Sequence, residues 1–390
     1  MTDASSGEPL RILHVSEVHY GGVVTLLRYF VAAQHEAGHD VHLLAPGAIP
    51  TLPGATMHEW HLDRGRPRDL VTWIRELRST VARVQPDVIH LHSFIAGLVG
   101  RLPGSLSWAG RVPMVYQPHA WSTDLFKQKS LSAAVAATER FGGNKTDLMV
   151  ANCRDEVDAG RALGVTTPAH VLGVAMDLER FHPVDAATRQ QVRQELGVDG
   201  QHVVLCLGRV TWQKAQDLLL PVWDRRPLPG ATLALVGPGD PEAVRSLAPT
   251  EFDRSVRFFG PSDDVRPWLW AADVLVLSSR YEGFPMVVAE AMAAGLPVVS
   301  TAVNGAHEAL REGELPIAGE VVPLGDMDGL LDLAQARLAD PDQVAAERVG
   351  ARLRAEELYD PAMVTGRLEA AYREAIARSA STRTRAGSRA

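Results

Sequence analysis

The sequence alternates, almost from end to end, between short apolar runs and longer stretches in which apolar residues recur at helical spacing. Runs typical of buried strands are "RILHVSE" (11–17), "DVHLLAP" (40–46), "DVIHLHS" (87–93), "VPMVYQP" (112–118) and "DLMVAN" (147–152), then "HVVLCLGR" (202–209), "ATLALVG" (231–237), "VRFFG" (256–260), "ADVLVLSS" (272–279) and "LPVVST" (296–301). Helical patterns such as "LVTWIRELRSTVARV" (70–84) lie between them. This alternation predicts an α/β protein built from doubly wound parallel sheets.

The length of 390 residues indicates two domains, because one hydrophobic core rarely grows so large. A polar, proline-containing segment at 182–200 precedes a new strand, so we expect an N-terminal domain over 1–190 and a C-terminal domain over 191–360. A helix over about 361–378 could pack back on the first domain, and the basic stretch 379–390 is predicted to be a disordered tail. Ligands are expected in a central cleft that both sheets face, outside the carboxyl ends of the strands.

The amino-acid composition indicates the cellular location of the protein and the kinds of partner that it can bind. The chain is 46% apolar and 22% charged, with no run of about 20 apolar residues that would span a bilayer and no N-terminal leader, so we expect a cytoplasmic protein with at most peripheral membrane association. A net charge of −8 disfavours nucleic acid as a partner. The two cysteines, Cys153 and Cys206, are too few for a disulfide framework or a cysteine metal site.

Two glutamates frame a strand-to-helix turn at "EGFPMVVAE" (282–290). A helix N-terminus attracts anions, and Gly283 lets the backbone come close to a ligand, so a phosphate could bind the amides of Phe284, Met286 and Val287. Glu282 and Glu290 are separated by eight residues, about 12 Å along a helix, and would reach hydroxyl groups on either side of a diphosphate. The plainer alternative is that Glu282 favours the helix dipole and Glu290 is a solvated or paired helix residue.

The segment "GRVTWQK" (208–214) follows the first strand of the second half. Arg209 and Lys214 would lie at the carboxyl end of that strand, where two cations can neutralise a diphosphate. Lysine is rare in this chain, which favours a need for a compact ammonium at Lys214, although a solvated loop lysine is the alternative.

Other candidates come from the first half. Gly21 and Gly22 lie between the first strand and the first helix, where a phosphate or merely a tight turn would call for glycine, and no G-x-G-x-x-G or P-loop pattern accompanies them. His119 ends the strand in "YQPHAW", and His90 and His92 end another. A His-x-His pair can bind metal, but no third ligand is spaced to join it, so we predict no metal site.

Two further segments have competing interpretations. Aspartates at 326–328 ("DMD") resemble a metal-binding motif, but a helix start explains them better. Aromatic and basic residues gather at 121–129, including Trp121, Phe126, Lys127 and Lys129. They would suit a membrane surface, an acceptor or a solvated face, and the near-neutral first half favours one of the last two.

Taken in order, these motifs make the sequence resemble a retaining glycosyltransferase of family 4 with the GT-B fold. "EGFPMVVAE" is similar to the Glu-x7-Glu signature of that family, "GRVTWQK" to its Gly-Arg and Lys element, and "VHYGGVV" (18–24) to its early glycine pair. The likeness spans about residues 11 to 376. One departure is "GVAMD" (173–177), with Val174 and Ala175 where the family commonly has Asn and Gly.

The resemblance implies a role for each matching residue. Arg209 and Lys214 would hold the diphosphate of a UDP- or GDP-sugar, and Gly22 would approach it from the first domain. Glu282 would contact donor-sugar hydroxyls, Glu290 the ribose, and the amides after Gly283 the sugar and the β-phosphate, while His119 would lie beside the anomeric carbon. Transfer would need no metal or other cofactor, would retain the anomeric configuration, and would take place on an acceptor hydroxyl that the sequence does not identify.

Two other functions compete with this one. A sugar-nucleotide 2-epimerase shares the fold but not the Glu-x7-Glu arrangement. A non-catalytic two-lobed solute-binding protein also closes two α/β lobes on a ligand, but here an export signal is lacking and the anion-binding residues gather on one lobe.

Overall fold

The structure, a computed structural model, describes residues 8–62, 69–102, 105, 112–125 and 129–387. The chain divides into two compact units: unit 1 contains residues 1–175 and 361–390, and unit 2 contains residues 176–360. The division falls earlier in the chain than the expected boundary at 190, because the polar segment with its helix belongs to unit 2.

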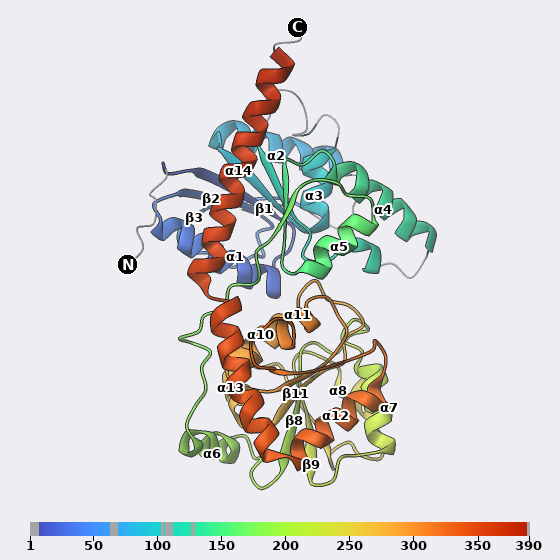
Figure 1. Cartoon of the computed structure of the whole chain (residues 1–390). Coiled ribbons are helices and arrows are strands. Elements are labelled where there is room, and N and C mark those ends of the chain that lie inside the picture. Colours follow the sequence, from blue (N-terminus) through green and yellow to red (C-terminus); the bar gives the residue numbers. More distant parts are fainter. Residues whose placement is uncertain (1–7, 63–68, 103–104, 106–111, 126–128, 388–390) are drawn as a thin grey trace. The chain divides into compact units, whose positions relative to one another are not determined.

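Unit 1 is built on a parallel sheet of seven strands in the order β3-β2-β1-β4-β5-β6-β7 (Figure 1). The strands are β1 (Arg11–Ser16), β2 (Asp40–Ala45), β3 (Ala55–Glu59), β4 (Val88–His92), β5 (Met114–Gln117), β6 (Leu148–Ala151) and β7 (Ala169–Val171). The helices are α1 (Gly22–Glu36), α2 (Leu70–Val84), α3 (Ser93–Arg101), α4 (Lys129–Gly143), α5 (Arg154–Ala162) and α14 (Pro361–Gly387), with a short 3-10 helix, η2 (Ser122–Leu125).

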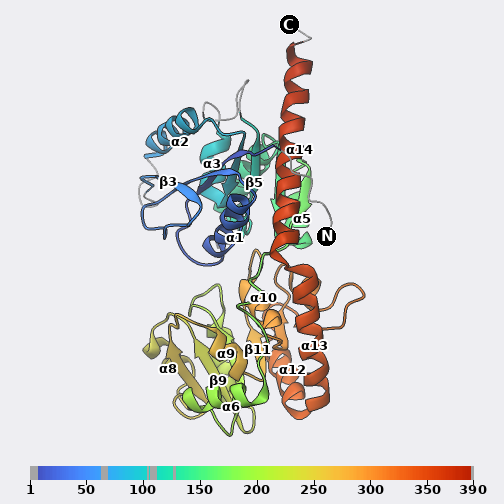
Figure 2. The same cartoon turned by 90° about the vertical axis from the view of Figure 1, so that its left-hand side faces the viewer.

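The two faces of this sheet are covered by different helices. Leu13, Ile89 and Tyr116 belong to an apolar cluster that also includes Trp73 and Leu77 of α2. On the opposite face, α1 packs against β2, and α14 contacts α1 and strands β4 to β6 (Figure 2). The C-terminal helix is therefore part of the wall of unit 1.

Unit 2 is built on a second parallel sheet, of six strands in the order β10-β9-β8-β11-β12-β13. Its strands are β8 (His202–Leu207), β9 (Ala231–Val236), β10 (Val256–Gly260), β11 (Val274–Leu277), β12 (Val298–Thr301) and β13 (Gly319–Val322). The helices are α6 (Ala186–Glu195), α7 (Gln216–Arg225), α8 (Pro241–Leu247), α9 (Arg266–Ala271), α10 (Met286–Ala293), α11 (Ala306–Leu310), α12 (Met327–Ala339) and α13 (Pro341–Leu358). The expected doubly wound α/β architecture is confirmed.

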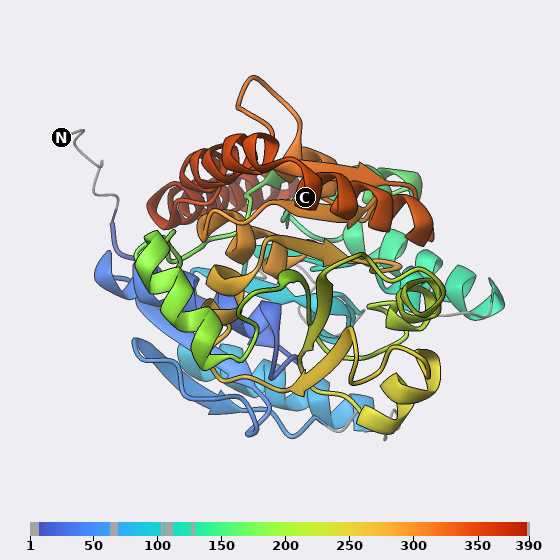
Figure 3. The same ribbon diagram turned by 90° about the horizontal axis from the view of Figure 1, so that it is seen from below.

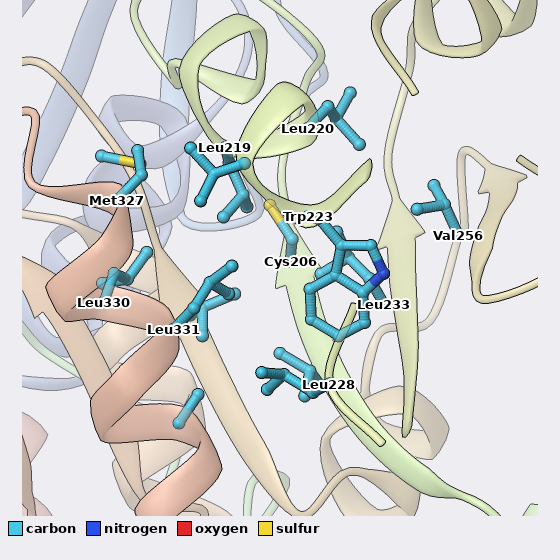
Figure 4. Close-up of a cluster of buried hydrophobic side chains, with 14 of the residues drawn as sticks. Cys206, Leu219, Leu220, Trp223, Leu228, Leu233, Val256, Met327, Leu330 and Leu331 are labelled. Carbon is cyan, nitrogen blue, oxygen red and sulfur yellow. The ribbon is translucent and has the colours of Figure 1, made fainter. Parts of the chain in front are cut away.

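The core of unit 2 lies between the sheet and helices α7 and α12. Trp223 of α7 is fully buried among Leu228, Leu233 and other apolar side chains, with Cys206 of β8 and Leu331 of α12 in the same cluster (Figure 4). On the other face, α10 packs against β12 and α13, and α13 also contacts α12 (Figure 3). This packing fixes β8, β11 and α10, the elements that carry the candidate site.

Two expectations about particular segments are wrong. Trp121 does not belong to a solvated or membrane-facing surface, because it is 1% exposed and its Nε1 atom donates a hydrogen bond of 2.7 Å to the carbonyl oxygen of Glu156. Of the other residues in that proposed surface, 126–128 lie outside the described residues. The expected disorder from residue 379 is also not found, because the backbone of α14 is helical to Gly387.

The expectation for the aspartates at 326–328 is confirmed. Asp326 caps α12 by accepting a hydrogen bond of 2.9 Å from the amide of Gly329, so these aspartates belong to a helix start. Val174 and Ala175 are fully buried, which fits apolar residues at these positions. In the described part of the chain, no helix combines the length and the apolar character needed to span a membrane.

Candidate active site

The strand orders locate the place in each unit where a ligand is expected. In unit 2 the connections run from β8 to β9 in one direction, and β11 is added on the other side of β8. The order reverses in the same way between β1 and β4 in unit 1. Open α/β sheets bind ligands outside the carboxyl ends of the strands at such a switch point. The sequence-predicted residues lie at these two edges.

Lys214 and Glu282 meet at the switch point of unit 2. Lys214 follows β8 and Glu282 follows β11, and their Nζ and Oε1 atoms are 2.7 Å apart. Both side chains are largely buried, with 16% and 9% of their surfaces exposed. The lysine ammonium has three donors, so it can hold Glu282 and still donate to a phosphate.

Two side chains that the sequence analysis did not select hold Glu282 in place. Ser279 donates a hydrogen bond of 2.8 Å to Oε1, and the Gln213 amide donates one of 3.1 Å to Oε2. Gln213 also donates to the carbonyl oxygen of Tyr281, and Ser278 donates to the carbonyl oxygen of Lys214, so the loops after β8 and β11 are tied together. The Glu282 carboxylate is thus oriented before any ligand arrives.

The loop after β8 takes an unusual path that brings Lys214 back to the sheet edge. Ala215, the residue before α7, has a left-handed φ of 57°. Gln216 is buried and its side chain donates to the carbonyl oxygen of Arg209 and accepts from the amide of Thr211. Gly237, at the end of β9, passes so close to the main chain of Gly208 that a Cβ atom there would lie 2.2 Å from its carbonyl oxygen. The close packing of these turns sets the position of the cations.

Arg209 and the residues after Gly283 also follow the carboxyl ends of β8 and β11. Arg209 is exposed and lies two residues after the end of β8. Phe284 and Val287 are buried and Met286 is half-buried, and the ring of Phe284 packs edge-on against Tyr359 at 5.6 Å. No side chain caps the N-terminus of α10, and amide groups at an uncapped helix start can donate to an anionic ligand.

Glu290 lies in α10, after the helix N-terminus that follows Glu282, and is half-buried. Burial raises its pKa to about 7, and the charges of Lys214 and Arg180 partly oppose that rise. The two glutamates therefore differ in character: Glu282 is in an ion pair, whereas Glu290 titrates near neutral pH. A carboxyl group so placed can accept or donate a hydrogen bond to a hydroxyl.

Unit 1 presents Gly22 and His119 at the carboxyl edge of its sheet. Gly21, with φ 77°, precedes α1, which begins at Gly22 without a side-chain cap. His119 comes two residues after the end of β5 and has φ 60°, and Ala120 has φ 156°. Consecutive non-glycine residues in these conformations store strain of the kind found at functional sites.

His119 is the end of a group of four histidines. Its Nε2 atom is 3.0 Å from Nδ1 of His92, and Nε2 of His92 is 2.9 Å from Nδ1 of His14. His14, His90 and His92 are fully buried beneath α1 and α14. Burial lowers the pKa of His14 to about 4 and that of His119 to about 3, and it lowers those of His90 and His92 well below the usual value, so all four rings are neutral at pH 7.

The reason given for excluding a third ligand beside His90 and His92 is wrong. His14 joins them, because β1 pairs with β4 in a register that places His14 opposite His90. Ring nitrogen atoms of the three residues lie within 4.8 Å of one another, close enough to share a metal ion. The spacing within one strand could not reveal a ligand from its neighbour, although the two strands on either side of a predicted switch point could have been compared.

Comparisons with known proteins identify families and relatives that this chain resembles. Residues 20–180 match the family described as Glycosyltransferase Family 4, and residues 201–340 match Glycosyl transferases group 1. D-inositol 3-phosphate glycosyltransferase 1 of Catenulispora acidiphila is 29% identical, with 87% of this chain and 88% of that protein covered. The D-inositol 3-phosphate glycosyltransferase of Rhodococcus erythropolis is 32% identical, with 70% and 67% covered.

Solved structures share the fold at low sequence identity. Sucrose-phosphate synthase from Thermosynechococcus elongatus superposes with a TM-score of 0.81 at 21% identity, covering 94% of this chain and 99% of that one. HepE of Anabaena, solved in complex with UDP-glucose, gives a TM-score of 0.74 at 21% identity, covering 96% and 100%.

The two parallel-sheet units, each with a switch point in its strand order, and these relatives define a glycosyltransferase of the GT-B fold. Within that class, the chain belongs to glycosyltransferase family 4, as the resemblance predicted.

Proposed function

We propose that this glycosyltransferase moves a hexose-type sugar from a nucleoside diphosphate to a hydroxyl of an acceptor, with retention of the anomeric configuration and without a metal. The ion pair of Lys214 with Glu282 at the switch point of unit 2 is the observation that carries this proposal. It joins a cation suited to phosphate and a carboxylate suited to sugar hydroxyls in one preorganised group.

Unit 2 would bind the donor. Arg209 and Lys214 would neutralise the diphosphate, and the amides of Phe284, Met286 and Val287 would bind the β-phosphate and the sugar. Glu282 would accept hydrogen bonds from sugar hydroxyls, and Glu290 would contact the ribose. HepE was solved with UDP-glucose, so this donor is the first to test, followed by GDP-sugars.

Unit 1 would supply Gly22 as a contact to phosphate and His119 as the side chain beside the anomeric carbon. It would also bind the acceptor, which in this family belongs to polysaccharide, glycolipid or small-metabolite synthesis. The likeness to D-inositol 3-phosphate glycosyltransferases makes a phosphorylated cyclitol one acceptor to test.

The chemistry would rest on the leaving group. As the bond from the anomeric carbon to the diphosphate breaks, negative charge grows on the phosphate oxygen atoms, and cations fixed in advance stabilise it. Lys214 and Arg209 would take the part that a divalent metal plays in other transferases. Retention would follow if the acceptor hydroxyl attacks from the face that the diphosphate leaves.

A panel of UDP-, GDP- and ADP-sugars, with thermal unfolding and product analysis, tests the proposal. The correct donor raises the melting temperature of the wild type, and free nucleoside diphosphate appears when an acceptor is added. Lys214→Met removes both effects, whereas Arg245→Met, which removes an exposed cation of the same unit, keeps them. An isomerised donor sugar without nucleotide release would favour the 2-epimerase, and tight binding of free sugar without nucleotide would favour a solute-binding protein.

A further inference from the structure

A continuous chain of hydrogen bonds connects His119 to the C-terminal helix through the interior of unit 1. It runs from His119 to His92 (3.0 Å), from His92 to His14 (2.9 Å) and from His14 Nε2 to Gln34 Oε1 of α1 (2.8 Å). The Gln34 amide nitrogen donates to the hydroxyl of Tyr372 in α14 at 3.4 Å. His14, His92 and Tyr372 are at most 1% exposed and Gln34 is 7% exposed, so water does not compete along the chain.

The direction of donation along these hydrogen bonds is determined at the Gln34 end. A neutral imidazole has one N–H and one acceptor nitrogen. Because the Gln34 nitrogen donates to Tyr372, its oxygen faces His14 and accepts from Nε2–H. His14 Nδ1 is then an acceptor and receives Nε2–H of His92, and His92 Nδ1 in turn receives Nε2–H of its neighbour.

The hydroxyl of Tyr372 is the last group in this series of hydrogen bonds. It accepts from Gln34 and is 2.8 Å from Nδ1 of His90, to which it donates. A phenol hydroxyl has one hydrogen, so a reversal at either of its contacts requires a reversal at the other. The orientation of the Gln34 amide is therefore coupled to a second buried group, and neither can turn alone without losing a hydrogen bond.

We propose that Gln34, His14, His92 and Tyr372 are positioning residues that hold His119 in the tautomer with its proton on Nε2, so that Nδ1 is offered as a hydrogen-bond acceptor to a sugar hydroxyl. The chain acts through His119 and touches no substrate itself. The last step, recognition of a hydroxyl, rests on the proposed function of His119, whereas the tautomer is a property of unit 1 that can be measured without any substrate.

The left-handed backbone at His119 agrees with this role. Its φ of 60° is left-handed, and for a residue other than glycine a conformation of this kind persists only where the surroundings determine it. The planes of the His92 and His119 rings differ by 18°, with centroids 5.3 Å apart, so the two rings lie nearly in one plane and their hydrogen bond is an in-plane bond between ring nitrogens. This geometry fixes both the direction and the rotation of the ring.

The tautomer of each ring is read directly by nitrogen NMR of the full-length protein labelled with ¹⁵N-histidine. The signals of His119 are those that disappear in His119→Gln. We expect the wild type at pH 7 to carry the His119 proton on Nε2, with the same tautomer for His14 and His92. A proton on Nδ1 of His119 would mean that the chain runs in the opposite direction, and would overturn the proposal.

Tyr372→Phe tests the far end of the chain. Without the hydroxyl, the Gln34 amide loses the contact that distinguishes its two ends, and we expect the tautomer ratio of His119 to shift toward the Nδ1–H form by about fivefold, the equivalent of one neutral hydrogen bond. Tyr116→Phe is the matched control, because it also removes a buried hydroxyl of unit 1, which is bonded to Glu139 instead. It should leave the ratio unchanged.

Gln34→Met provides a second route to the same result if Tyr372→Phe does not fold. An unchanged His119 tautomer in the folded variants, or an equal shift in Tyr116→Phe, would show that the chain does not control the ring. Metal analysis of the wild-type protein provides a separate check. Zinc bound in stoichiometric amount would also overturn the proposal, because coordination by the three clustered histidines would use the nitrogen lone pairs that the chain needs. If the tautomer is as expected but no sugar is transferred, the proposed function fails and the positioning role stands.

Discussion

Removing the charge of Lys214 should affect the folding of unit 2 as well as the binding of a ligand. In Lys214→Met, the carboxylate of Glu282 stays in a site where 9% of its surface is exposed and loses its only described ionic partner at 2.7 Å. It keeps the hydrogen bonds from Ser279 and Gln213. The variant thus isolates the ionic contact while most of the carboxylate's surroundings are preserved.

The expected cost follows from these contacts. A hydrogen bond to a charged group contributes roughly 1.5–3 kcal/mol, and a fully buried charge without any partner would cost more, so we expect a loss of about 2–3 kcal/mol. In a domain of this size, each kcal/mol corresponds to about 2–4 °C, which gives a decrease in Tm of roughly 4–12 °C. Glu282→Gln keeps the shape and the hydrogen bond that Gln213 donates, and its new amide group can donate to the hydroxyl of Ser279, so its cost should be lower, about 1 kcal/mol.

Calorimetry of the full-length wild type, the two single variants and the double variant measures the coupling between the two side chains. We expect the double variant to recover about 1–2 kcal/mol relative to the sum of the single variants. Arg245→Met is the control, because its ion pair with Asp253 is 3.2 Å long and half exposed, and such pairs contribute less than about 1 kcal/mol. Additive single effects, or a Lys214→Met variant as stable as the Arg245→Met control, would refute the idea that the pair is preorganised.

Three further predictions concern other residues. Glu290→Gln should be more stable than the wild type at pH 8 and equal to it near pH 4, because the raised pKa of about 7 favours folding below pH 4.5 and this contribution is lost as the pH rises from there through 7. A rise from 4.5 to 7 corresponds to roughly 3.4 kcal/mol for a fully buried carboxyl group, and because Glu290 is half-buried we expect about 2 kcal/mol. Urea unfolding at several pH values measures this difference, and a difference that does not change with pH would contradict it. Gly237→Ala should lower the free energy of unfolding by more than about 2 kcal/mol and also weaken nucleotide binding. Gly230→Ala is the control, because Gly230 has φ 67° but open space for a Cβ atom, and it should cost only about 1 kcal/mol in thermal unfolding. Equal losses in the two variants would contradict the close approach of Gly237 to Gly208. Trp121→Phe should lose about 1–2 kcal/mol of the stability of unit 1 with the hydrogen bond of its indole, and an unchanged Tm would show that this bond contributes nothing.

The central strands of both sheets were predictable, and three of the edge strands were not. β3, β7 and β13 were missed, and each is the last strand at one side of its sheet. An edge strand pairs on one side only and exposes part of its surface, as the half-buried residues of β3 and β7 show, so it lacks the continuous apolar run that identifies a central strand. β10 is also an edge strand, but "VRFFG" has enough aromatic and branched residues to be recognised.

The candidate site was predictable where its residues are close together in the sequence. The turn before α10 and the loop after β8 can each be recognised from a strand pattern, a glycine and a helix pattern in succession. Lys214 and Glu282 then meet because β8 and β11, the strands that they follow, are neighbours in the sheet. Gln213 and Ser279, which hold Glu282, have no distinctive pattern because their role depends on side-chain direction. Gln34 and Tyr372 were missed for another reason: they are 338 residues apart and meet only because α14 returns to α1.

Backbone strain independently marks the carboxyl edges of the two sheets as the place of the candidate site. In the described part of the chain, six residues other than glycine have positive φ, and they are Gln85, Ser93, His119, Ala120, Ala215 and Asp253. Four of them follow the carboxyl ends of β4, β5 and β8, strands at or next to the two switch points. Each such residue costs on the order of 1 kcal/mol, which a turn serving only to connect a strand and a helix could avoid by using glycine. Because the cost is concentrated where the sheet order reverses, it is best explained as the cost of fixing His119 and Lys214 in place before a ligand binds.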